Sequence, residues 1–249
     1  MKKTDPTDFG FSQVSAAEKT QRVRAVFESV ASRYDLMNDL MSVGMHRLWK
    51  RQAIALLDVR PRQRILDLAA GTGDLTRLIH DRTAGQASII MSDINAAMLT
   101  QGRDRLLDAG ITAGIDYLQA DAAALPFPPL SFDRICIAFG LRNVTDKPAA
   151  LRAAHAALRY GGQYLILEFS RLQLRSLQPV YDAYSFRGLP WLGQRIANDA
   201  DSYRYLAESI RRHPDQQTLS DMLYAAGFTR VDCTNLAGGI VAIHRAWKL

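Results

Sequence analysis

One stretch decides the fold of this 249-residue chain: Ile65-Leu66-Asp67-Leu68-Ala69-Ala70-Gly71-Thr72-Gly73-Asp74. A short apolar run carries an acidic residue, a glycine-rich bend follows, and a helical pattern begins after the bend. An open α/β sheet builds a cofactor site in this way at the carboxyl end of its first strand. Gly71 and Gly73 let the backbone turn tightly and approach a ligand where a Cβ atom would collide. We therefore expect Asp67, Gly71, Thr72 and Gly73 to bind a nucleotide-like molecule.

The acidic positions indicate which molecule this is. A dinucleotide loop needs a third glycine where this chain has Thr76, and Asp67 would repel a pyrophosphate but suits an α-ammonium group. Asp93 ends the next apolar run, where a carboxylate can hold ribose hydroxyls. Asp121 and Ala122 close a third predicted strand, beside the expected adenine edge. Each position alone also suits a helix cap or a structural acid, but together they predict S-adenosylmethionine.

The wider pattern predicts an α/β fold of the Rossmann-like class I methyltransferase type. We expect a seven-stranded sheet in the order 3-2-1-4-5-7-6, with strand 7 antiparallel and helices on both faces. The predicted strands are 64–69, 87–92, 115–119, 133–139 and 163–169, followed by a hairpin at 229–235 and 239–244. The predicted helices are 18–32, 46–57, 74–80, 96–108, 147–159 and 216–226, with Gly161-Gly162 as a helix-to-strand turn.

The domain organisation follows from where this alternation begins and breaks. Residues 1–57 are predicted to form an N-terminal helical extension on the substrate side, loosely ordered before Glu18. Residues 58–249 are the predicted methyltransferase domain. Its alternation breaks at about 171–215, where some forty residues without a predicted helix are rich in tyrosine and tryptophan; such an excursion is typical of a lid or a binding loop.

Composition limits the partners. The net charge is +6, yet basic residues are spread along the chain, so nucleic acid is not expected as a partner. A basic cluster at 47–64 fits either a solvated face or a contact with an anionic membrane. Cys136 and Cys233 lack metal-ligand spacing and are predicted to be buried thiols in a reducing cytosol, with no metal bound. Neither a signal peptide nor an apolar stretch of membrane-spanning length is recognised, which predicts a cytoplasmic protein and leaves peripheral contact with the inner membrane open.

Two segments point to the acceptor substrate. Residues 34–49 combine three methionines with Tyr34, His46 and Trp49, which fits an adaptable apolar pocket as well as ordinary core. Arg142 and Asn143 follow the fourth predicted strand, whose end faces the transferred methyl group in this architecture. We expect them at the reaction centre, although Arg142 could instead only pair with a carboxylate.

At these segments the chain resembles a known family. The stretch 34–51, the sequence GLRNVTDK at 140–147 and the sequence NDADSYRYLAESI at 198–210 are similar to those of the bacterial ubiquinone/menaquinone biosynthesis C-methyltransferases. The resemblance implies methylation of a ring carbon in polyprenylated benzoquinol and demethylmenaquinol, with S-adenosylmethionine contacts at Thr72, Asp93, Asp121 and Ala122. The chain departs from the family at Ala138, where a serine often contacts the cofactor. A polyprenylated quinol is the implied partner; quinone-biosynthesis proteins and a second copy of the chain are further partners to test.

The expected chemistry needs a proton acceptor for the quinol hydroxyl. Arginine is a poor base, so Arg142 is expected to stabilise the developing phenolate while Asn143 positions that oxygen. Tyr34, His46, Asp199 and Asp201 are the candidate acceptors. The alternative functions are an NAD-dependent oxidoreductase, a nucleic-acid methyltransferase, a methyltransferase of another small aromatic substrate, and a non-catalytic component of a quinone-biosynthesis assembly.

Overall fold

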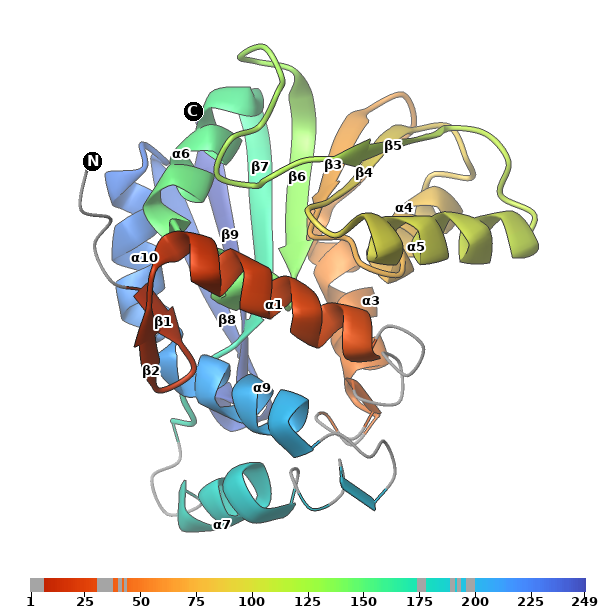
Figure 1. Cartoon of the computed structure of the whole chain (residues 1–249). Helices are drawn as coiled ribbons and strands as arrows, with labels where there is room; N and C mark the ends of the chain where they lie inside the picture. The colour runs from red at the N-terminus through yellow and green to blue at the C-terminus, as the bar shows by residue number, and fades with distance from the viewer. Residues whose placement is uncertain are drawn as a thin grey trace.

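The computed structural model describes residues 7–30, 38–39, 42, 44–173, 178–188, 191, 194–195 and 200–249. Its centre is a seven-stranded sheet in the order β5-β4-β3-β6-β7-β9-β8 (Figure 1). Neighbouring strands from β5 to β7 are parallel, and β9 is antiparallel to both β7 and β8. This confirms the predicted order and the antiparallel last strand. The strands are β3 (Arg64–Leu68), β4 (Ser88–Asp93), β5 (Ile115–Gln119), β6 (Phe132–Ala138), β7 (Leu158–Phe169), β8 (Arg230–Leu236) and β9 (Val241–Lys248).

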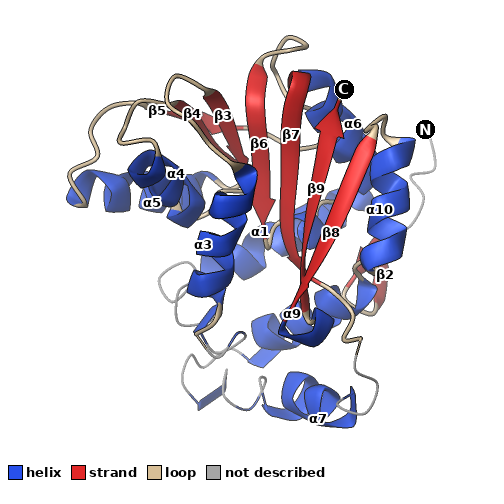
Figure 2. Ribbon diagram, turned by 180° about the vertical axis from the view of Figure 1, so that it is seen from behind, coloured by secondary structure: helices blue, strands red, loops and turns tan. Residues whose placement is uncertain are grey.

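Helices cover both faces of this sheet, as expected, because its inner strands are apolar on both sides (Figure 2). Along β6, Cys136 faces one hydrophobic cluster while its neighbours Ile135 and Ile137 face the other. One cluster includes residues of α3 and α4, and the other includes residues of α6 and α10. The helices are α3 (His46–Leu57), α4 (Asp74–Arg82), α5 (Ala96–Asp108), α6 (Lys147–Ala157) and α10 (Gln216–Ala225).

The described part of the N-terminal segment, from residue 7 onward, is more ordered than predicted. A hairpin of β1 (Thr7–Phe9) and β2 (Ser12–Val14) precedes α1 (Ala16–Val30). Gly10, at φ +57°, makes the turn possible, and the Phe9 ring stacks on Tyr205 with centroids 4.3 Å apart. For residues 7–17 the expectation of loose order was therefore wrong, because this hairpin gains its stability from a distant helix that the local sequence does not reveal. Residues 1–6 lie outside the described residues.

The segment after β7 also contains helices that were not predicted. It includes α7 (Gln178–Ala183), a π-helical turn at Tyr184–Gly188 and α9 (Ala200–Arg212). Tyr203, Tyr205 and Leu206 of α9 are buried in the hydrophobic cluster that also includes residues of α3 and α4. A lid role therefore remains a prediction only for the part of the segment that precedes α9.

Two further local predictions were wrong. Gly161-Gly162 lies within β7 instead of forming a turn, at a register shift between β7 and β6 that Gly161 accommodates with φ +76°. Cys136 is buried as predicted, but Cys233 is exposed because β8 is the edge strand of the sheet. No helix within the described ranges is long and apolar enough to cross a bilayer.

Candidate active site

The glycine loop connects β3 to α4 at the carboxyl end of the sheet. Gly71 and Gly73 adopt positive φ angles of 57° and 82°, which favour glycine, and the Gly71 N–H donates a 2.9 Å hydrogen bond to Asp93 Oδ2. The loop packs on α5 at Gly102, where a Cβ atom would lie 2.7 Å from Gly71 O. Sequence reasoning missed Gly102; a lone glycine inside a predicted helix was the available signal.

Asp67 lies beneath this loop and is almost completely buried, at 1% exposed. Its Oδ2 accepts a 2.7 Å hydrogen bond from Thr76 Oγ1, and the Cys136 thiol lies 3.6 Å from Oδ1. Burial raises the pKa of Asp67 to about 6, against these hydrogen bonds. The position that excluded a dinucleotide loop, Thr76, thus fixes the carboxylate expected to face an ammonium group.

Asp93 and Asp121 occupy the ends of the next two strands, where they were expected. Asp93 accepts hydrogen bonds from the backbone of Gly71 and Asn95, and burial raises the pKa of its carboxyl above the ordinary value. The exposed Asp121 caps the backbone N–H of Ala123, and Ala122 is half-buried. The Ala120 N–H donates to Asp93 O, which brings the two strand ends together. Each carboxylate oxygen retains acceptor capacity for a ribose hydroxyl or an adenine amino group.

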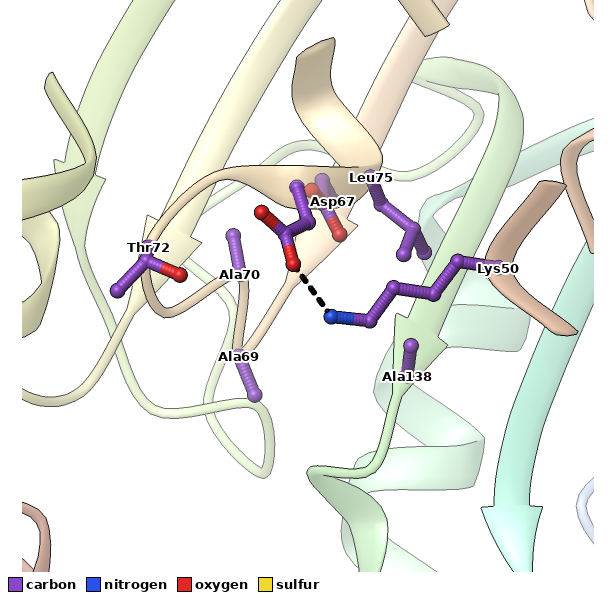
Figure 3. Close-up of a pocket in the computed structure, with 8 residues that line it drawn as sticks. Lys50, Asp67, Ala69, Ala70, Thr72, Leu75 and Ala138 are labelled. Atoms are coloured by element: carbon purple, nitrogen blue, oxygen red, sulfur yellow. Dashed lines mark hydrogen bonds and ion pairs between the residues drawn. The ribbon is translucent and has the colours of Figure 1, made fainter. Parts of the chain in front are cut away.

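A small pocket lies between the glycine loop, α3 and the end of β6 (Figure 3). Lys50 enters it from α3 and forms a 2.6 Å ion pair with Asp74 Oδ2, which the dashed line in Figure 3 marks. The sequence placed Lys50 in a basic surface cluster, and for this residue the prediction was wrong, because the side chain is buried. Its place in an amphipathic helix gave no sign of this burial. Ala138, the position of the missing serine, also faces the pocket. The lining is completed by Asp67, Ala69, Ala70, Thr72 and Leu75.

Arg142 and Asn143 lie in a 3-10 turn, Leu141–Asn143, just beyond β6. Arg142 is 4% exposed, and its Nη1 donates at 2.6 Å both to Glu168 Oε1 and to the backbone oxygen of Phe139. The carboxylate partner considered from the sequence therefore exists. Glu168 was missed, although an acid within the apolar run of β7 was a signal for a buried partner.

Asn143 is half-buried, and a residue of α9 holds its side chain in place. The Tyr205 hydroxyl donates a 3.1 Å hydrogen bond to Asn143 Oδ1, which leaves the Nδ2 donors of the amide available. Tyr205 is itself held by the stacked ring of Phe9. The structure thus connects the N-terminal hairpin, α9 and the turn after β6.

The predicted proton acceptors are described only in part. Tyr34 and Asp199 lie outside the described residues. Asp201 is in contact with solvent, its side chain 91% exposed, and pairs with Arg204. His46 is buried, with Nε2 2.9 Å from Asp39 Oδ1; burial and then Lys50 lower its pKa, so the ring is neutral near pH 7.

The arrangement fits S-adenosylmethionine. The pocket offers a buried cation and a buried carboxylate to an amino-acid group, the loop has no Cβ at Gly71 or Gly73, and Asp93 follows at the next strand end. In the part of the chain that the structure describes, no three His, Cys, Asp or Glu side chains group together as metal ligands.

Comparison with known proteins gives close relatives over the whole chain. Residues 15–248 match the ubiE/COQ5 methyltransferase family. The ubiquinone/menaquinone biosynthesis C-methyltransferase UbiE of Edwardsiella ictaluri is 55% identical over 244 residues, covering 98% of this chain and 97% of that protein. The UbiE protein of Xanthomonas campestris pv. campestris is 54% identical over 243 residues, covering 98% and 96%.

Solved structures share the fold at low sequence identity. A Thermotoga maritima S-adenosylmethionine-dependent methyltransferase, a possible histamine N-methyltransferase, has a TM-score of 0.63 at 19% identity and covers 90% of this chain and 99% of that chain. Haemonchus contortus phosphoethanolamine N-methyltransferase 2, in complex with S-adenosylmethionine, has a TM-score of 0.57 at 16% identity, covering 79% and 52%.

Proposed function

Because this chain belongs to the ubiE/COQ5 methyltransferase family, we propose that it transfers a methyl group from S-adenosylmethionine to a ring carbon of a polyprenylated quinol, in ubiquinone or menaquinone biosynthesis or both. The observation that carries the proposal is the meeting of two loops at one edge of the sheet. Asp67 near the end of β3 and the glycine loop that follows this strand suit the methyl donor, and the Arg142-Asn143 turn after the adjacent strand β6 suits an oxygen of the acceptor. Ligands bind in this type of sheet where the strand order reverses, which is between β3 and β6.

The donor side uses the residues described above. Asp67 supplies charge to the ammonium group, the loop at Gly71, Thr72 and Gly73 approaches the ligand closely, and Asp93 receives the ribose. Asp121 and Ala122 lie at the adenine end. When bound, S-adenosylmethionine supplies a methyl group on a sulfonium sulfur, which a carbon nucleophile can attack in line.

The acceptor side must hold the quinol and stabilise its oxygen after the proton leaves. The Nδ2 donors of Asn143 bond to no residue that the structure describes, and they suit a developing phenolate, since donors held in place before reaction stabilise charge without reorganising. Arg142 contributes positive charge nearby, but Glu168 already pairs with it. We therefore assign Asn143 the direct contact with the oxygen, and Arg142 the role of fixing the turn and adding to the local field.

The proton acceptor is proposed to be a neutral or ionised side chain near the pocket. His46 fits chemically because its lowered pKa leaves the ring unprotonated near neutral pH, and its Nδ1 has no hydrogen-bond partner within the described residues. Tyr34 and Asp199 remain further candidates. Asp201 fits less well because it is exposed and paired with Arg204.

We further propose that the protein meets its substrate by peripheral contact with a membrane. Leu48 is 54% and Met45 42% exposed near the start of α3, beside exposed Arg47 and Arg51. Exposed apolar groups next to cations suit an anionic bilayer surface. Co-sedimentation with anionic vesicles should be weakened by Leu48→Glu and should not change with Leu107→Glu, on the exposed face of α5. Equal binding by both variants would contradict this surface.

The proposed activity is tested by turnover and by quinone profiling. The purified protein should methylate a reduced demethylmenaquinone, and the carbon position should be identified by mass spectrometry and NMR of the product. A deletion strain should accumulate a demethylated quinone, and the precursor it accumulates names the pathway. Turnover of an unrelated aromatic acceptor, with no turnover of either quinol, would favour the alternative small-molecule methyltransferase; failure to bind S-adenosylmethionine would exclude the proposed chemistry.

A further inference from the structure

We propose that Lys50 is a cofactor-binding residue that holds the α-carboxylate of the methionyl group of S-adenosylmethionine. The inference rests on the proposed use of that cofactor. It concerns a side chain that lies outside the glycine loop and enters the pocket from α3, a helix that precedes the first strand of the sheet.

The burial of Lys50 is the first observation. Lys50 is 6% exposed, and an ammonium group so far from water is costly unless polar groups surround it. Its Nζ carries three N–H donors, and Asp74 Oδ2 takes one of them at 2.6 Å. Within the described ranges of the chain, no second acceptor lies within hydrogen-bonding distance of Nζ. Donor capacity therefore remains on a buried cation that faces the pocket (Figure 3).

The partner of Lys50 is itself shared between cations. Asp74 Oδ1 lies 3.7 Å from Arg105 of α5, while its Oδ2 pairs with Lys50. Asp74 therefore keeps a cation after Lys50 gains a second anionic partner. Because Asp74 begins α4, its carboxylate also benefits from the positive end of that helix. The ion pair orients Lys50 toward the loop without exhausting its donors.

The pocket is complementary to an amino acid. Lys50 and Asp67 both line it, one positive and one negative, although they do not form an ion pair with each other. The methionyl end of S-adenosylmethionine carries an ammonium and a carboxylate on one carbon. Placing the ammonium on the Asp67 side leaves the carboxylate to Lys50, and each charge then meets its opposite in a site of low polarity.

The test measures binding, without a quinol, by titration calorimetry. The two ligands are S-adenosylmethionine and its decarboxylated form, which keeps the sulfonium and the amine but lacks the carboxylate. Wild type should bind the decarboxylated ligand about ten- to a hundredfold more weakly, the range for a lost hydrogen bond to a charged group. Lys50→Met should weaken S-adenosylmethionine binding by the same factor and leave the affinity for the decarboxylated ligand nearly unchanged.

Two variants separate ligand recognition from fold. Arg105→Met removes the other cation near Asp74 and should keep the wild-type preference for the carboxylate. Lys50→Arg keeps a positive donor and should retain part of the preference; it replaces Lys50→Met if the latter fails to fold by circular dichroism. Equal weakening of both ligands in Lys50→Met, or no preference in wild type, would overturn the assignment. If neither ligand binds wild type, the cofactor proposal itself fails.

Discussion

Replacing Glu168 by glutamine should destabilise the fold strongly. Glu168 is 2% exposed, and one of its oxygens accepts from Arg142 Nη1 at 2.6 Å and from the Phe169 N–H at 2.9 Å. Its other oxygen accepts a hydrogen bond from the backbone N–H of Arg142 at 3.1 Å. Glutamine keeps one acceptor oxygen, but its NH₂ group would face a backbone donor. The substitution also leaves the Arg142 guanidinium buried without its counterion.

The loss of the counterion of Arg142 sets the size of this destabilisation. Removing one partner of a buried ion pair costs about 3–5 kcal/mol, because the remaining charge stays out of water. A domain of ordinary stability unfolds with about 5–15 kcal/mol, so the variant should lose a large share of its stability. The exposed pair of Glu18 and Arg22 gives a matched control: Glu18→Gln should cost less than about 1 kcal/mol.

Urea denaturation followed by circular dichroism measures both variants. The expected result for Glu168→Gln is a large fall in midpoint, with the slope of the transition unchanged. The double variant Glu168→Gln/Arg142→Met should recover part of the loss, since it no longer buries a lone charge. A loss below about 1 kcal/mol in Glu168→Gln would refute the reasoning, because it would mean that Arg142 does not depend on this carboxylate and is free to serve the substrate directly.

Three further predictions concern the site. Tyr205→Phe removes the hydroxyl that orients Asn143, so it should lower kcat about three- to tenfold in steady-state kinetics. The Kd for S-adenosylmethionine, measured by calorimetry, should stay unchanged. A change confined to this Kd would contradict the prediction. Gly102→Ala places a Cβ 2.7 Å from Gly71 O, so the glycine loop must move. The substitution should lower the free energy of unfolding by about 1–3 kcal/mol and weaken cofactor binding. An unchanged Kd for S-adenosylmethionine would show that the loop tolerates this movement. Burial raises the pKa of Asp67 to about 6, above its unfolded value, so ionisation of this carboxyl opposes folding: the stability falls as the pH rises from about 4 to about 6 and stays at the lower level above that. Asp67→Asn should therefore stabilise the ligand-free protein at pH 7 by roughly 1–3 kcal/mol, yet it should weaken S-adenosylmethionine binding. The affinity of the wild-type protein for S-adenosylmethionine should fall as the pH decreases through 6. A Kd that does not change with pH would contradict a role for the carboxylate.

The donor side was predictable because its signals are local in sequence. A strand, a glycine bend and a helix occur consecutively at 64–82, and Asp93 ends the next strand. Alternating strands and helices predict parallel strands, whose carboxyl ends carry such loops to one edge of the sheet. The strand order itself was predicted from the class I methyltransferase arrangement. The resemblance at 140–147 added the acceptor chemistry. Arg142 and Asn143 follow the fourth parallel strand, β6, as predicted, and their place at the reaction centre stays a prediction.

Other features depend on contacts between distant segments. Glu168 is 26 residues from its partner Arg142, and Tyr205 is 62 residues from Asn143. The hairpin at 7–14 is stabilised by packing on α9, a helix that was not predicted because its segment is rich in aromatic residues. Lys50 was read as part of a basic face because periodicity does not reveal which turn of a helix meets a cavity. In each case long-range packing decided the structure.

The two halves of the site are held in register by direct contact between their loops. Gly140 precedes the Arg142-Asn143 turn, and a Cβ atom at that position would lie 2.6 Å from the Cβ of Ala69, in the loop after β3. The missing side chain lets the donor loop and the acceptor turn touch. Because methyl transfer requires the reacting atoms in a narrow range of distance and alignment, a shift of about 1 Å between these loops is enough to lower the rate strongly. The close approach at Gly140, together with the ion pair between Arg142 and Glu168, therefore fixes the position of Asn143, the residue proposed to contact the acceptor oxygen, relative to the donor loop.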